Sequence, residues 1–115
     1  MTSADAAPLE PDESLAQVAV LLDRAALLMW EQAETAGAES PLHDLGLGVY
    51  LARGAAAQLL TADCHVDGPE NIDERSVLEL LIDAESLIGA RTDFTYSDLA
   101  VELCDLIREV RAYGR

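Results

Sequence analysis

The chain has 115 residues, enough for one domain with a single hydrophobic core but too few for two independent domains. Its formal net charge is -15, and all 7 of its basic residues are arginines. So few cations exclude direct binding to nucleic acid and disfavour an anionic membrane surface, because both need clustered positive charge.

Residues 1–11 are mostly small, polar or acidic and include two prolines, so we expect a disordered acidic tail there. They have neither the basic start nor the apolar stretch of a secretory signal. Two cysteines are too few for a disulfide-stapled secreted domain. We therefore expect a cytoplasmic protein whose residues 12–115 form one helical domain.

A first helix is predicted from Asp12, a suitable N-terminal cap, to about Ala36, just before Gly37. Apolar residues recur along it at the spacing of one helix face, which we expect to lie in the core. These residues are Leu15, Val18, Leu22, Ala25 and Met29. A second, thinner apolar stripe runs along another side of this helix and consists of Val20, Leu27 and Trp30.

A second helix is predicted from Ser40 and Pro41, because the hydroxyl can cap a helix and proline fits its first turn. The stretch from Leu45 to Leu60 is apolar on nearly every side, so we expect helices packed all round it. Each of its glycines would cost about 1 kcal/mol against alanine, which close contact with a neighbouring helix can offset. Arg53 near its centre argues against a membrane-spanning segment.

Asn71 and Glu74 have the spacing of a capping box and predict the start of a third helix, which ends before Gly89. Thr95 with Asp98 predicts the start of a fourth helix. No segment shows the alternating pattern of a strand. Four helices joined by short loops predict an all-α fold, an antiparallel up-down-up-down four-helix bundle behind the flexible N-terminal tail.

The segment between the second and third helices resembles the calcium loop of the EF-hand family from Asp63 to Glu74. The resemblance implies that Asp63, Asp67 and Glu74 ligate calcium. Three positions depart from the family pattern: His65 replaces an oxygen ligand, Pro69 occupies the carbonyl-donating position, and Glu70 stands where a hydrophobic residue normally packs. The alternative, which we expect, is a solvated acidic loop with Glu74 in the helix cap and no bound cofactor.

One strip of the second helix combines small and polar residues, with His43, Tyr50 and Arg53 beside Gly46 and Ala57. If the strip faces a crevice, it could bind a small ligand, because a guanidinium offers a bidentate fork to a carboxylate or phosphate. The alternative, which we expect, is that Arg53 forms a salt bridge with a carboxylate of an adjacent helix.

Glu31 with Glu34, and Glu102 with Asp105, resemble the Glu-x-x-Glu and Glu-x-x-Asp pairs with which all-α nucleotide pyrophosphohydrolases bind magnesium. The resemblance covers these four residues alone. The alternative, which we expect, is that they belong to solvated acidic helix faces.

A lone four-helix bundle would expose the second stripe of the first helix, together with Leu78 and Ile82 of the third helix. Isologous dimers are the commonest way to cover such surfaces. The expected interface residues are Val20, Leu27, Trp30, Leu78 and Ile82. We therefore expect a small acidic, non-catalytic interaction or regulatory module that is homodimeric and binds another protein. One alternative is a small-ligand or metal-binding helical protein, including an enzyme, that uses the strip or the Asp63–Glu74 loop. Another is an acidic decoy of nucleic acid.

Overall fold

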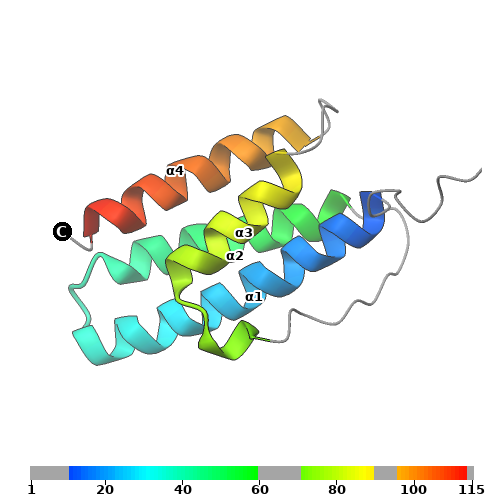
Figure 1. Cartoon of the computed structure of the whole chain (residues 1–115). Helices are drawn as coiled ribbons and strands as arrows, with labels where there is room; N and C mark the ends of the chain where they lie inside the picture. Colours follow the sequence, from blue (N-terminus) through cyan, green and yellow to red (C-terminus); the bar gives the residue numbers. More distant parts are fainter. Residues whose placement is uncertain (1–10, 60–70, 90–95, 114–115) are drawn as a thin grey trace, which may run out of the picture.

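The computed structural model describes residues 11–59, 71–89 and 96–113. They form the helices α1 (Pro11–Ala36), α2 (Leu42–Leu59), α3 (Val77–Gly89) and α4 (Ser97–Tyr113), with a short 3₁₀ helix, η2 (Ile72–Glu74), before α3 (Figure 1). No strand occurs among these residues. The predicted all-α four-helix bundle is therefore confirmed.

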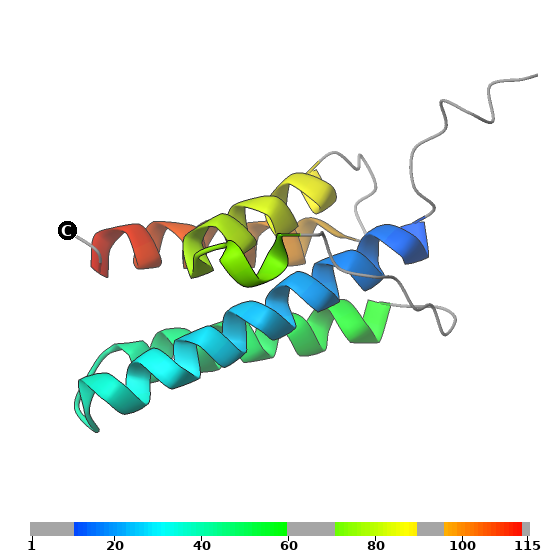
Figure 2. The ribbon, with the colours of Figure 1, turned by 60° about the horizontal axis from the view of Figure 1, so that its bottom comes forward.

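The helices lie in two layers, α1 beside α2 and α3 beside α4 (Figure 2). Between the layers, α1 packs on α3 and α2 packs on α4. One surface hollow is lined by Gln32 near the end of α1, Leu42 at the start of α2, Val77 at the start of α3 and Arg111 near the end of α4. The helices α2 and α3 therefore run in one direction and α1 and α4 in the other, as Figure 1 also shows.

The direction of α3 departs from the expected up-down-up-down order, in which α3 would oppose α2. That order assumed a short loop, but an extended chain between Leu59 and Ile72 could reach roughly 40 Å. The 18 residues of α2 rise only about 27 Å, so the connection is long enough to return along the bundle. Each helix still lies antiparallel to both of the helices on which it packs.

The hydrophobic core lies between the two layers. All five residues of the stripe predicted on α1 are buried, and buried apolar residues of the other three helices join them in one cluster. The largest fully buried side chains are Leu15, Val18, Leu22, Met29, Val49, Leu80, Leu81, Ile88 and Leu103. Periodicity therefore identified the buried face of α1.

The outer side of α2 departs from the expectation that helices surround it. Leu47 and Leu51 are exposed, because α2 packs closely only on α1 and α4. Two neighbours cover about half of a helix, and an apolar sequence pattern does not show whether anything covers the rest. The apolar outer side of α2 is thus a surface of the folded chain.

The connection between α1 and α2 has the predicted signals at both ends. Gly37 has a positive φ of 105°, and its N–H donates a hydrogen bond of 3.1 Å to the carbonyl of Ala33. This left-handed conformation ends α1 at little cost because glycine has no side chain. The N–H of Leu42 donates to the hydroxyl oxygen of Ser40 over 3.1 Å, which confirms Ser40 as the cap of α2.

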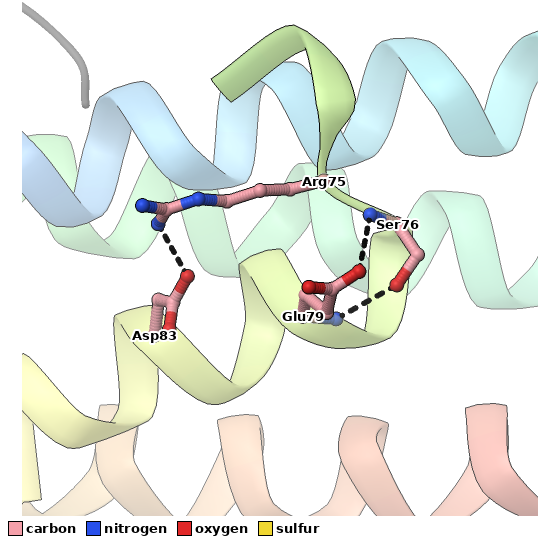
Figure 3. Close-up of polar contacts among 4 residues, drawn as sticks. All are labelled: Arg75, Ser76, Glu79 and Asp83. Atoms are coloured by element: carbon pink, nitrogen blue, oxygen red, sulfur yellow. Dashed lines mark hydrogen bonds and ion pairs between the residues drawn. The ribbon is translucent and has the colours of Figure 1, made fainter. Parts of the chain in front are cut away.

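The capping box of α3 lies five residues beyond its predicted place. Asn71 makes no side-chain cap hydrogen bond. Instead the N–H of Ser76 donates to Oε1 of Glu79, and the N–H of Glu79 donates to Oγ of Ser76, both over 3.1 Å (Figure 3). The bond that the carboxylate of Glu79 accepts from the Ser76 N–H lowers the pKa of Glu79. An ion pair between Arg75 and Asp83 lies beside the capping box. Both candidate boxes have the same spacing, so spacing alone did not separate them.

Some expectations lie outside the described residues. They concern nearly all of the acidic tail at residues 1–11 and the cap of α4 at Thr95. Within the described residues, no helix has both the length and the apolar composition needed to cross a bilayer.

Gly48 marks a close approach of α2 and α4. A Cβ atom at this position would lie 2.8 Å from Cδ2 of Leu106, which is too close for an ordinary contact. At Gly54, a Cβ atom would meet nothing within 4 Å. The predicted role of small residues in close helix packing is therefore confirmed at Gly48.

The two glycines form a matched pair for a stability test. We expect Gly54→Ala to raise the free energy of unfolding by about 1 kcal/mol, because alanine favours the helix and meets no neighbour there. Gly48→Ala gains the same propensity but must displace the buried Leu106 side chain, so it should stabilise less or destabilise. Urea denaturation of both variants measures the difference, and equal stabilisation would contradict the close approach.

Candidate functional site

An open groove of about 480 Å³ runs between α1 and α2. Leu27 and Trp30 line it from α1, and Leu47 and Tyr50 line it from α2. These four side chains are 45%, 58%, 57% and 56% exposed, respectively. We call this surface the α1–α2 groove. It is the place on the described surface where large exposed apolar side chains of two helices meet.

Small residues make the groove possible. Ala26 and Gly46 also line it, and neither side chain is large enough to fill the space between the four larger residues. A Cβ atom at Gly46 would lie 3.4 Å from Cβ of Met29, an ordinary van der Waals contact. The small residues between the two helices therefore leave the surface between them hollow.

Polar contacts join α1 to α2 near the groove. Nε of Arg53 lies 2.7 Å from Oδ1 of Asp23, and Asp23 lines the groove. Toward the connecting loop, Nε2 of His43 donates to the carbonyl oxygen of Gly37 over 2.9 Å. These contacts tie the two helices together on either side of Tyr50.

The residues of the strip predicted on α2 therefore have different surroundings. His43 and Tyr50 line the groove, so this part of the strip does face a crevice. Arg53 forms the expected salt bridge with a carboxylate of the adjacent helix. Asp23 therefore occupies Nε of this guanidinium, so the fork that includes Nε is not free for an anionic ligand.

The five predicted interface residues lie on α1 and α3 and differ in exposure. Leu27 and Trp30 belong to the α1–α2 groove, and Val20 of α1 is partly buried. Leu78 and Ile82 of α3 are partly buried as well, and they belong to the other layer (Figure 2). The interface expected from the sequence stays a prediction.

Sequence reasoning missed the role of Leu47, which it placed among neighbouring helices. The sequence does contain a sign of the groove, because Leu27 and Trp30 are three residues apart on α1, as are Leu47 and Tyr50 on α2. Two exposed apolar pairs at this spacing on adjacent antiparallel helices predict a shared groove. Recognising it required knowing that no other described helix covers the outer side of α2.

The predicted calcium ligands Asp63 and Asp67 lie outside the described residues. Glu74 is described and is exposed in η2. Across residues 11–59, 71–89 and 96–113, no three His, Cys, Asp or Glu side chains form a group that could hold a metal ion. The calcium prediction stays untested at its two aspartates.

The carboxylate pairs that resemble a magnesium site do not meet. Glu31 and Glu34 lie on α1, whereas Glu102 and Asp105 lie on α4. These two helices are not closely packed, because α1 packs on α2 and α3. Asp105 instead forms an ion pair of 3.4 Å with Arg108 of its own helix.

Cys104 lacks the surroundings of a reactive thiol. It is exposed on α4, with Sγ 3.9 Å from Oε1 of Glu85. Desolvation, and after it the negative charge of Glu85, raise the pKa of the thiol. The thiolate is the reactive form of cysteine, so this site disfavours nucleophilic chemistry.

Comparisons of the chain with protein-family models, with curated proteins and with solved structures found no match. The functional argument therefore depends on the chemistry of the groove.

The Asp23–Arg53 pair can be tested by a double-mutant cycle of Asp23→Asn and Arg53→Gln. Because the side chains are 67% and 40% exposed, we expect a coupling energy of about 0.5 kcal/mol, as for other surface pairs. The coupling should shrink in about 1 M salt, where charges are screened over about 3 Å. Coupling above about 2 kcal/mol that persists in salt would contradict a solvent-exposed pair.

Proposed function

We propose that this chain is a small, non-catalytic interaction module that binds another protein through the α1–α2 groove. The observation that carries the proposal is the meeting of four large, half-exposed apolar side chains on one face. Isolated exposed apolar residues are ordinary on protein surfaces, but a contiguous group on two adjacent helices is typical of a binding surface.

The residue types support this role. Tryptophan and tyrosine are enriched among the side chains that contribute most to protein interfaces, because they bury large areas with few rotatable bonds. The chain has one tryptophan and three tyrosines, and Trp30 and Tyr50 both line the groove. Half of their surface is free for a partner to cover.

A small-molecule site is a second candidate, because a volume of about 480 Å³ falls within the usual range of ligand pockets. Such pockets, however, bury most of their ligand between their walls. Here the walls themselves are largely exposed, with Trp30 and Leu47 each more than half accessible. An open groove of this kind suits a larger partner that covers both its walls and its floor.

The homodimer expected from the sequence stays a prediction. A second copy could cover the α1–α2 groove, but it would leave Leu78 and Ile82 on the other layer. The proposal therefore concerns the groove and does not depend on self-association.

Affinity capture from the native host tests the proposal with matched baits. The groove bait carries Trp30→Ser and Leu47→Ser. The control bait carries Val101→Ser and Tyr113→Ser on α4, where the side chains are 60% and 47% exposed. We expect a protein that wild type and the control bait capture but the groove bait does not.

The captured protein is then purified and titrated against the wild-type chain, the groove bait and the control bait. Circular dichroism first shows that these three proteins have equal helicity. Truncation of two central anchors should weaken its binding by about tenfold or more. Equal capture by the groove and control baits, or capture by none, would contradict the proposal.

A further inference from the structure

We propose that the occupant of the α1–α2 groove is a cationic amphipathic α-helix of the partner protein, an inference that rests on the proposed function. Three features of the groove carry it: the small number of free hydrogen-bonding groups along its walls, its length, and the sign of the charges around it.

The groove has few free groups with which to pair a peptide backbone. Its polar side chains are Asp23, His43 and Tyr50. Oδ1 of Asp23 is engaged by Arg53, and Nε2 of His43 is engaged by the carbonyl of Gly37, which leaves the hydroxyl of Tyr50 and the second polar atom of each of the other two side chains. An extended peptide would lose water from its N–H and C=O groups along the groove and gain few partners in exchange. A helix pairs these groups internally, so it can enter an apolar groove.

The length of the groove fits a short helix. Its lining on α1 extends from Asp23 to Ala33, which corresponds to roughly 15 Å along the helix axis, or about three turns. A helix lying along the groove would present apolar residues at positions i, i+3, i+4 and i+7 over this distance. It would add a further helix to the outer side of the α1–α2 layer.

The charges around the groove favour a cationic partner. From residue 23 to residue 53, the α1–α2 hairpin carries five carboxylates and two arginines. Both arginines already form ion pairs, Arg24 with Asp73 at 3.7 Å and Arg53 with Asp23 at 2.7 Å. The carboxylates of this hairpin without an ion pair to a described residue are Glu31, Glu34, Glu39 and Asp44. A partner with lysine or arginine beside its apolar face would complement them.

The same charges argue against a second copy as the occupant. A two-fold dimer through the groove would bring each set of these carboxylates toward its own equivalent, and like charges across an interface oppose association. Each chain also has a net charge of -15, which adds a general repulsion. A cationic helix would meet neither the repulsion between carboxylates nor the repulsion between net charges of one sign.

A direct test uses a synthetic 15-residue helix of leucine and lysine, with leucines at i, i+3, i+4 and i+7 and a fluorescent label. The first control peptide has the same composition in scrambled order, and the second replaces each lysine by glutamate. Fluorescence anisotropy measures the affinity of the full chain for each. We expect the amphipathic lysine helix to bind at least about tenfold more tightly than the scrambled peptide, and the glutamate helix not to bind.

Protein variants show whether binding occurs in the groove. Leu27→Ser with Leu47→Ser should weaken binding of the lysine helix by about tenfold or more, whereas Val101→Ser with Tyr113→Ser should change it by less than about twofold. Glu31→Gln with Glu34→Gln should weaken it more than Asp98→Asn with Glu109→Gln, which removes the same charge from α4. Circular dichroism confirms that each variant is folded.

Any one of four results would overturn this inference. Equal binding of the lysine and scrambled peptides, or no effect of the groove variants, would reduce the interaction to general charge attraction. Binding of the glutamate helix would remove the charge argument. Self-association of the wild-type chain that the groove variants abolish would make a second copy the occupant. If the lysine helix does not bind but the groove bait loses a partner that the control bait captures, the proposed function stands and only the cationic helix is wrong.

Discussion

The close packing of α1 on α2 is the constraint on which the rest of this structure depends. Buried residues of α1 and α2 face one another, and together the inner faces of the two helices supply more than half of the core residues. Since each helix of the bundle packs closely on only two others, the outer side of this pair has no cover from α3 or α4. The hairpin that supplies the core therefore also supplies the exposed groove.

Polar contacts keep this hairpin in one arrangement without filling the groove. The left-handed Gly37 ends α1, His43 donates to its carbonyl, and Arg53 pairs with Asp23. Each of these contacts is individually weak at a surface. Together they engage polar groups that could otherwise bind a ligand, so the free surface that remains is mainly apolar with acidic surroundings. Such a surface suits recognition of a folded partner better than chemistry.

Local signals in the sequence predicted much of this arrangement, and tertiary context decided the rest. Helix periodicity identified the core, Gly37 and Ser40 marked the first connection, and an acidic chain made an ion-paired Arg53 the expected outcome. The direction of α3 was missed because loop length permits either a short turn or a return along the bundle. The exposure of Leu47 was missed because the sequence pattern does not distinguish an apolar residue in the core from one on an exposed helix face.

The fluorescence of Trp30 gives the most direct test of the central claim, that the α1–α2 groove is uncovered in the isolated chain. Trp30 is the only tryptophan and is 58% exposed, so its emission reports on this face alone. The account predicts red-shifted emission that acrylamide quenches readily and that does not change with protein concentration. Blue-shifted emission protected from acrylamide would contradict it, because the face would then already be covered.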